Sequence, residues 1–289
     1  MHVPRIWKRE YIEDTDAHGN VLSAFGWGWS DSSEEEARSR ASATARRVMD
    51  WLIGGNEVDD PHHYGYDERL PREEIVREFV DAAGTTYSFI TRNSYGSLVL
   101  NARDLVFIDV DLPDAPKPKP VSLLARLFGK KPSLPSDPSQ VILDEIRATA
   151  RLHDDLGFRI YRTANGFRVA ISNQLLTADS PRVQQLLSEF GADLLYVRMC
   201  KNQQCFRARL TPKAWRCGAG MPPGRYPFGS SSDEAEYRTW ESQYTQTVSP
   251  YSVCQLVESI GPAEVHPELD GLIKLHDELT KCRDQHPLA

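Results

Sequence analysis

The sequence has few features of a membrane or secreted protein. None of its apolar runs approaches the roughly 18 residues that a membrane-spanning helix needs, and the N-terminal stretch MHVPRIWKREYIEDTD contains no apolar signal-peptide core. Only five cysteines occur in 289 residues, and an odd number fits reduced thiols better than a disulfide framework. We therefore expect a cytoplasmic, bacterial-type protein without membrane contact.

Several common catalytic motifs are also missing. The sequence contains no G-x-x-x-x-G-K-[ST] loop, no G-x-G-x-x-G after a strand and no G-x-S-x-G elbow. Their absence argues against P-loop hydrolases, Rossmann dehydrogenases and α/β-hydrolases.

Other candidate metal ligands are weak. Cys200, Cys205 and Cys217 follow a C-x4-C-x11-C spacing, which fits zinc loosely and favours ordinary thiols. The doublets His153-Asp154 and His276-Asp277 resemble those of metal-dependent phosphohydrolases, but their mixed α/β surroundings favour polar residues on helix surfaces.

The charge distribution is uneven. A net charge of −7 argues against a protein that coats nucleic acid through its overall field. Residues 157–216, however, contain ten Lys and Arg but only three Asp and Glu, so this segment carries +7. It therefore indicates either a local anion site or a solvated basic surface.

The N-terminal part predicts a mixture of strands and helices. Two strands are expected at 3–12 and 21–29, around a polar turn, and a capped helix follows at 31–55. Residues 70–84, LPREEIVREFVDAAG, predict a short helix, and 85–111 predict three antiparallel strands.

The second half of the chain is more regular. Helices are expected at 139–157 and 180–191, a hairpin around Asn165-Gly166, and a last strand pair at 193–200 and 205–213. The predicted fold is α+β, with an RRM-like antiparallel sheet and helices on one face. The expected domains are an N-terminal α+β region at 1–97, this core at 98–216 and a mostly helical tail at 217–289.

A proline-rich insertion interrupts the core. Residues 113–138 hold seven prolines around the amphipathic stretch VSLLARLFGKK, so we expect a flexible, exposed segment. It offers either a short helix that folds back on the domain or a docking point for a protein partner.

The stretch LVFIDVDLPD predicts the most specific chemistry. Residues i and i+2 of a strand share one face, so Asp109 and Asp111 project together, about 6–7 Å apart. Two like charges at that spacing favour a divalent cation such as Mg²⁺ or Mn²⁺. The alternative is that one carboxylate caps the following turn and the other is solvated.

Arginines on neighbouring strands extend this prediction. Arg207 and Arg209 alternate with apolar residues, so they share a face of their strand. Guanidinium groups beside a metal could hold a metal–triphosphate. Alternatively, the two arginines pair directly with Asp109 and Asp111.

These features resemble the catalytic core of the archaeo-eukaryotic primases and primase-polymerases. The shared pattern is D-x-D at a strand end, a Thr- and Gly-containing hairpin, and a later Asp in GADLLYVR, and it covers about 40% of the chain, residues 98–216. The resemblance implies metal binding and catalysis by Asp109, Asp111 and Asp193. It also implies phosphate contacts from basic residues, and the candidates are Arg162, Arg168, Arg207, Arg209 and Lys213.

One position departs from the family pattern. The second motif is Ser-x-His in that family, whereas this hairpin reads TANGFR and places Arg168 where the histidine is expected. Two alternatives follow. The first is a primase-like nucleotidyltransferase using Mg²⁺ or Mn²⁺, with a nucleoside triphosphate and single-stranded nucleic acid as partners. The second is a non-catalytic binding module derived from such a fold, which acts through nucleic-acid or protein contacts.

Overall fold

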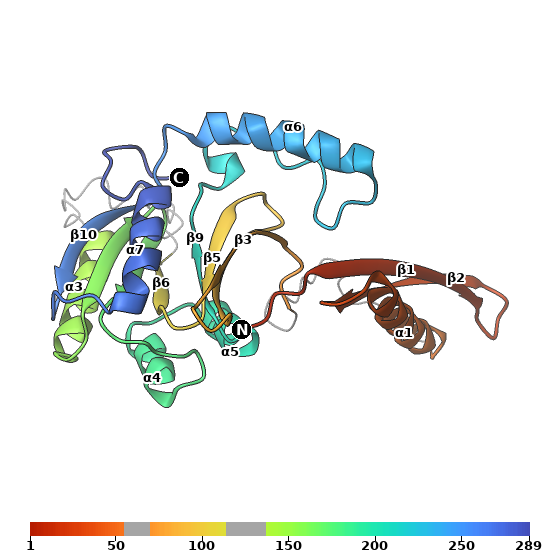
Figure 1. The fold of residues 1–289 in the computed structure, drawn as a ribbon, viewed down its shortest axis with the longest axis horizontal. Helices are drawn as coiled ribbons and strands as arrows, with labels where there is room; N and C mark the ends of the chain where they lie inside the picture. Colours follow the sequence, from red (N-terminus) through yellow and green to blue (C-terminus); the bar gives the residue numbers. More distant parts are fainter. Residues whose placement is uncertain (55–69, 114–136) are drawn as a thin grey trace, which may run out of the picture.

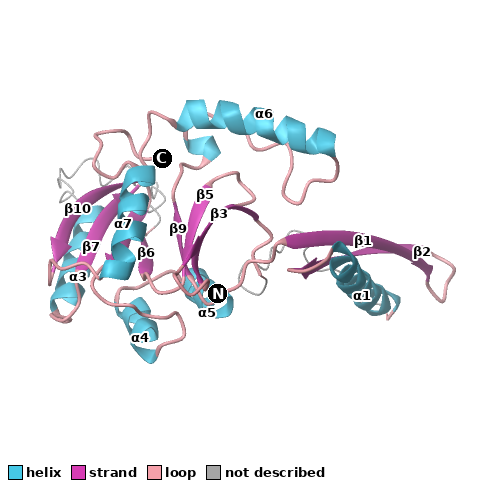
Figure 2. Cartoon of the chain, in the orientation of Figure 1, coloured by secondary structure: helices cyan, strands magenta, loops and turns pink. Residues whose placement is uncertain are grey.

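The computed structural model describes residues 1–54, 70–113 and 137–289, and it confirms the α+β class. The strands form three antiparallel sheets with the orders β1-β2, β3-β4-β5-β9 and β10-β7-β8-β6 (Figures 1 and 2). The predictions for the insertion at 113–138 fall almost entirely on 114–136, which lie outside the described residues. No helix in the described ranges is long and apolar enough to cross a membrane.

The N-terminal unit consists of β1 (Ile6–Thr15), β2 (Val21–Ser30) and α1 (Glu34–Ile53), as predicted, and it projects from one end of the molecule (Figure 1). Helix α1 packs unusually closely on one face of the hairpin. A Cβ atom on Gly28 would lie 2.2 Å from the carbonyl oxygen of Ala37. Glycine in the strand and alanine on the helix therefore permit this contact.

The first four-stranded sheet contains β3 (Glu74–Val80), β4 (Thr86–Arg92), β5 (Leu98–Ala102) and β9 (Phe206–Arg209). The predicted helix at 70–84 is wrong, because its centre is strand β3. Register shifts in the β3–β4 pairing lie between Ile75 and Arg77 and between Phe79 and Val80. These irregularities break the alternation of a regular strand, so the apolar residues acquire a helix-like spacing.

The second four-stranded sheet contains β6 (Phe107–Asp111), β7 (Phe158–Thr163), β8 (Gly166–Ile171) and β10 (Cys254–Ile260). The hairpin at Asn165-Gly166 is confirmed, but the edge strand β10 comes from the expected helical tail. The strands expected in one sheet over 98–216 are thus divided between two sheets, and both sheets extend beyond that range.

In the described ranges, five helices pack around the sheets. They are α3 (Pro138–Arg151), α4 (Pro181–Glu189), α5 (Leu194–Gln203), α6 (Ser231–Val248) and α7 (Pro267–Thr280). His276 of α7 contacts Phe107 and Tyr161 on one face of the second sheet, whereas Phe190, at the end of α4, contacts Phe158 on the other. One hydrophobic core includes residues of both four-stranded sheets.

The predicted strand at 193–200 is also wrong, because these residues form α5. The side chain of Asp193 accepts a hydrogen bond from the backbone N–H of Tyr196 at 2.9 Å and caps the helix. Tyr196, Cys200 and Gln203 are buried at helical spacing, whereas Leu194 is 78% exposed. The apolar run that suggested a strand therefore lies partly in solvent.

Candidate functional site

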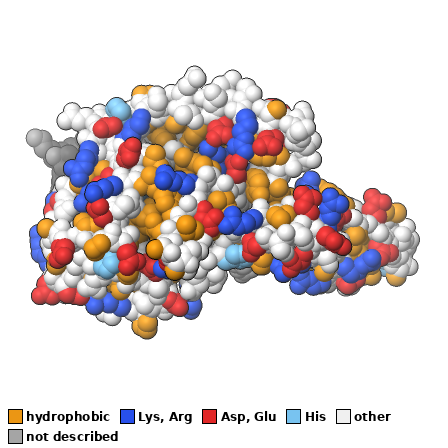
Figure 3. Space-filling model, in the orientation of Figure 1, with side chains coloured by type: hydrophobic (Ala, Val, Ile, Leu, Met, Phe, Trp, Pro, Cys, Tyr) orange, Lys and Arg blue, Asp and Glu red, His pale blue; other side chains and the backbone are white. Residues whose placement is uncertain are grey.

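The candidate site lies where the end of β6 meets β9 and the start of α5. Strand β6 places Asp109 and Asp111 on one face, as the alternation predicts. The backbone N–H of Asp193 donates to the carbonyl oxygen of Asp109 at 3.4 Å, which ties the start of α5 to β6. The space-filling view shows hydrophobic side chains between the two four-stranded sheets, with Lys and Arg side chains among them (Figure 3).

Asp109 is bound to Arg168, its direct cross-strand neighbour on β8. The Nε of Arg168 donates to Oδ1 of Asp109 at 2.9 Å, and Nη2 donates to Oδ2 at 3.3 Å. The Arg168 side chain is 2% exposed and that of Asp109 is 35% exposed. Arg168 therefore neutralises the first carboxylate of the D-x-D motif.

Further contacts fix the Arg168 guanidinium. Its Nη1 donates to the carbonyl oxygen of Arg209 at 3.0 Å and lies 3.5 Å from Nε2 of His276. Burial opposes the charge on Arg168, but the Asp109 carboxylate outweighs it and raises the arginine pKa above its ordinary value. Arg168 thus serves as a fixed cation inside the protein, beneath the site.

Asp111 is different from Asp109, because it is exposed and forms no ion pair with any described residue. Partial burial, together with the negative charges of Asp109 and Asp193, raises the pKa of its carboxyl. Lys213 and Arg216 oppose this rise. The three acids named by the sequence therefore share one electrostatic environment, and basic side chains face it.

Three cations line the same site. Arg209 ends β9, Lys213 follows it, and Arg216 belongs to the 3₁₀ turn η1 (Ala214–Arg216). None of the three forms an ion pair with a described residue, and Nη1 of Arg209 is buried without a hydrogen-bond partner. Burial and the charge of Arg168 lower the pKa of Arg209 to about 10, so it remains protonated at neutral pH.

The charges of these cations are mutually unfavourable. Burial, Arg209 and Arg216 all lower the pKa of Lys213, while Asp111 and Asp109 oppose the shift. Like-charged groups that have no carboxylate partner favour a bound anion. The site is therefore suited to a ligand that carries several negative charges.

An aromatic side chain borders the cations. Trp215 lies between Lys213 and Arg216 in the chain and is 47% exposed. Its ring packs edge-on against Tyr95, with centroids 5.2 Å apart, and the Lys213 ammonium lies 5.3 Å from the Trp215 ring centroid. A fixed, half-exposed indole is a surface on which a flat ring can stack.

Two predicted phosphate-binding residues lie elsewhere. Arg162 belongs to the opposite face of the second sheet from Asp109, and its Nη1 donates to the carbonyl oxygen of Gly166 at 2.8 Å. Arg207 is buried and donates to both carboxylate oxygens of Glu73, at 2.6 and 2.7 Å. Neither side chain is in a position to contact a ligand beside Asp111.

The described residues provide only some of the ligands that a metal ion needs. In the described part of the chain, no three His, Cys, Asp or Glu side chains are grouped to hold a metal. Both oxygens of Asp109 already accept from Arg168, and Asp193 caps α5. Asp111 remains as the free ligand, and Mg²⁺ in nucleotide sites binds one or two carboxylates plus substrate phosphates. The donor set thus fits a cation that arrives with a phosphorylated ligand.

Three contributors were not among the predicted site residues. Trp215 and Arg216 directly follow Lys213 in KAWRC, so adjacency to a predicted residue was the available signal. His276 is buried at 1% exposure against Arg168, contrary to the expected helix-surface position. The five cysteines, all described, are free and buried.

Comparison with known protein families, with curated proteins and with solved structures found no match to this chain.

Proposed function

We propose that this protein binds a nucleoside triphosphate together with Mg²⁺ or Mn²⁺ at the junction of β6, α5 and η1. The observation that carries the proposal is the convergence of Lys213 and Arg216 on the exposed carboxylate of Asp111, with Arg209 beside these two cations. None of the three cations has an ion-pair partner in the described residues, and Nη1 of Arg209 has no hydrogen-bond partner. Carboxylate and cations that meet in this way complement a metal-bound polyphosphate.

The acidic and basic residues of the site would contact different parts of the ligand. Asp111, with the exposed edge of Asp109, would contact the metal, while Arg209, Lys213 and Arg216 would contact phosphate oxygens. Arginine provides a planar pair of donors for phosphate, and lysine acts as a point charge. Arg168 would not touch the ligand, because both Asp109 and the Arg209 carbonyl already bind its guanidinium.

The Trp215 ring would stack on the nucleobase. Its exposure and its packing against Tyr95 leave one side of the site apolar and flat. Stacking on an aromatic ring tolerates every base, because each base has a π-face. We therefore expect binding to depend on the triphosphate more than on the identity of the base.

Calorimetric titration of the full chain with ATP and Mn²⁺ tests this function. We expect saturable binding that Lys213→Ala or Arg216→Ala weakens by at least about tenfold, since each removes a charge-assisted contact. Lys201→Ala, on the exposed side of α5, is the matched control and should bind as the wild type does. Absence of nucleotide binding by a correctly folded wild type would refute the proposal.

Nucleotidyl transfer of the primase type is the second candidate. It is favoured by the three acids Asp109, Asp111 and Asp193 in one electrostatic environment, because phosphoryl transfer needs chiefly metal, positioning and charge stabilisation. Against it stands the Asp109–Arg168 pair, which leaves the metal fewer free carboxylate oxygens. A protein that binds nucleotide without transferring it is the alternative.

A labelled nucleotide distinguishes transfer from binding. The full chain, Mn²⁺, an α-phosphate-labelled triphosphate and a primed single-stranded template should yield extended primer if transfer occurs. Asp111→Asn is the matched inactive variant. Binding in calorimetry without primer extension would place the protein among non-catalytic nucleotide binders.

A further inference from the structure

The N-terminal hairpin carries an aromatic face on the side opposite helix α1, which reaches this face at Trp29 through the Arg40 side chain. Alternate residues of β1 and β2 turn away from α1, because Gly26 and Gly28 occupy the helix side. The opposite side, called the aromatic face here, consists of Trp7, Arg9, Tyr11, Phe25, Trp27 and Trp29.

The outer part of this face lies in solvent. Tyr11 and Phe25 are direct cross-strand partners with ring centroids 5.8 Å apart, and they are 60% and 51% exposed. Single exposed apolar residues are normal on protein surfaces, but two contacting aromatic rings beside further tryptophans form a patch. The patch is not needed to bury α1, which packs on the other side of the hairpin.

A cation lies in the middle of the aromatic face. The Arg9 guanidinium carbon lies 4.8 Å from the ring centroid of Tyr11 and 5.3 Å from that of Trp27. Arg9 forms no ion pair with any described residue. The acid on this side of the hairpin is Glu13, which lies beyond Tyr11 toward the turn. Within the described part of the chain, the surface therefore places aromatic rings beside a positive charge that no ion pair neutralises.

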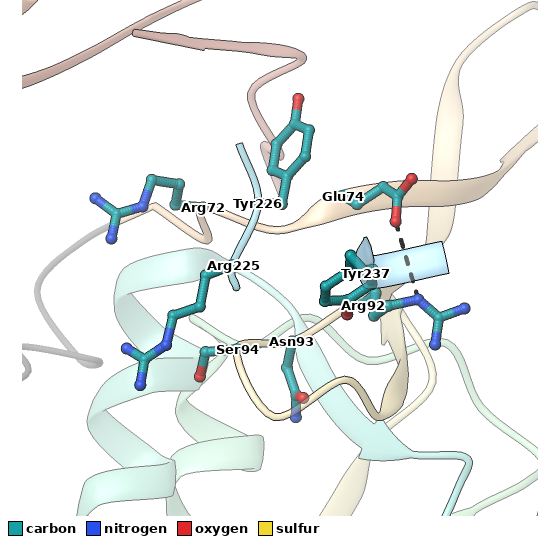
Figure 4. A pocket seen from close by; sticks show the side chains of 8 residues that line it. All are labelled: Arg72, Glu74, Arg92, Asn93, Ser94, Arg225, Tyr226 and Tyr237. Atoms are coloured by element: carbon teal, nitrogen blue, oxygen red, sulfur yellow. Dashed lines mark ion pairs between the residues drawn. The ribbon is translucent and has the colours of Figure 1, made fainter. Parts of the chain in front are cut away.

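Further arginines continue the surface toward the body of the protein. The Arg72 guanidinium carbon lies 3.9 Å from the Trp27 ring centroid. Arg72 also lines a pocket with Glu74, Arg92 and Arg225, in which Arg92 is paired with Glu74 and Figure 4 shows the Arg72 and Arg225 side chains extending in the same direction. Arg225 is exposed and has no carboxylate partner among the described residues. Two arginines, Arg72 and Arg225, thus lead from the hairpin into a pocket that also holds the Arg92–Glu74 ion pair.

We infer that the aromatic face and the adjoining arginine pocket bind single-stranded nucleic acid. Bases stack on Tyr11 and Phe25, while Arg9 and Arg225 contact the phosphates. Proteins that hold single strands without sequence preference combine stacking rings with a positive path in this way. This inference rests on residues outside the proposed nucleotide site, so each can fail without the other.

A single strand fits the surface better than other occupants. A duplex keeps its bases stacked internally and offers no ring to Tyr11 or Phe25. A second copy that met the same face about a two-fold axis passing near Arg9 would bring the two Arg9 side chains together, which is an unfavourable contact between like charges. Unpaired bases and phosphates complement both the rings and the charges.

Fluorescence anisotropy of a labelled oligothymidylate of about 20 nucleotides, titrated with the full chain, tests the inference. We expect binding that weakens steeply with added salt, because phosphate contacts release counterions. The Tyr11→Ala, Phe25→Ala double variant should bind at least about tenfold more weakly, because two stacking surfaces are lost. Its thermal melt should match that of the wild type, because both rings are exposed.

Two control variants test whether the aromatic face is the surface that binds the oligonucleotide. Trp51→Ala removes a 43% exposed aromatic residue of α1 and should leave oligonucleotide binding unchanged. Asp111→Asn should also leave it unchanged, while it impairs nucleotide binding at the other site. Equal binding by wild type and the double variant, or no binding by the wild type, would overturn the inference. So would sedimentation showing a wild-type dimer that the double variant abolishes, since the face would then be a self-association surface.

Discussion

Arg168 and Asp109 face each other across the β8–β6 pairing, and the buried guanidinium donates to both carboxylate oxygens at 2.9 and 3.3 Å. The two aspartates of the D-x-D motif are therefore not equivalent. Asp109 stabilises a buried arginine, whereas Asp111 is exposed beside Lys213 and Arg216.

The two aspartates should respond oppositely to neutralisation when no metal is present. Asp109→Asn should destabilise the fold by about 2 kcal/mol, less than the roughly 3–5 kcal/mol of a fully buried pair, because Asp109 is a third exposed. Asp111→Asn should leave stability unchanged or raise it slightly, since it relieves repulsion from Asp109 and Asp193. Urea unfolding in EDTA measures the stability of both variants. Equal losses of stability would contradict the different roles of Asp109 and Asp111.

The Arg207–Glu73 pair should be structural. Both side chains are nearly inaccessible, at 6% and 4% exposure. Glu73→Gln should therefore cost about 3–5 kcal/mol, because it leaves a guanidinium buried without its counter-charge. The surface pair Lys8–Glu34 provides the control, and Glu34→Gln should cost far less, because solvent screens this pair. Nucleotide binding by the folded Glu73→Gln protein should be intact, and its loss would place Arg207 in the site.

The buried His276 should make stability depend on pH. Burial and the charge of Arg168 lower its pKa in the folded state, against the opposing hydrogen bond to Asp277. As the pH falls below the unfolded histidine pKa of about 6.5, the unfolded chain binds a proton that the folded protein does not. Stability should therefore fall with decreasing pH, by up to about 1.4 kcal/mol per unit for this group.

Unfolding of wild type and His276→Asn at about pH 5 and 7.5 measures this contribution. The variant should show a smaller loss of stability at the lower pH. Lost packing against Phe107 should lower its stability at both pH values. An equal pH dependence in both proteins would show that His276 does not titrate differently on folding.

The close contact between β2 and α1 should not tolerate a side chain at Gly28. An added Cβ would meet backbone atoms of Ala37 and Ala41 at 2.2 Å. Gly28→Ala should therefore destabilise the N-terminal unit by at least the roughly 1–3 kcal/mol typical of overpacking. Gly220→Ala is the matched control, because no atom lies within 4 Å of its added Cβ. Thermal melts of the two variants should differ clearly.

Elements with strong local signals could be predicted from the sequence. Ser33 and Ser180 cap α1 and α4, and Asn165-Gly166 turns the β7–β8 hairpin, all through contacts between near neighbours. The errors arose where tertiary structure decided the outcome. Irregular pairing disguised β3, and the burial of Tyr196, Cys200 and Gln203 on one side favours a helix in an apolar run that reads as a strand.

The sequence predicted several residues of the site, but not which side chains they contact. Strand alternation correctly put Asp109 and Asp111 on one face, and the local basic segment contained Arg209 and Lys213. The partner of Arg207, in contrast, lies 134 positions away, and that of Arg168 depends on which strands pair. Sequence periodicity predicts on which face of a strand a side chain lies, but not which side chain of another element it contacts.

The proposal that Asp111 helps to bind a metal–nucleotide complex can be tested by calorimetry. ATP binding by wild type and Asp111→Asn is measured in Mn²⁺ and in EDTA. The wild type should bind at least about tenfold more tightly with Mn²⁺, a difference of about 1.4 kcal/mol. Asp111→Asn should lose that difference while it melts at the wild-type temperature or slightly above. Identical Mn²⁺-dependent binding by both proteins would contradict the account, because Asp111 is the carboxylate that it leaves free for the metal.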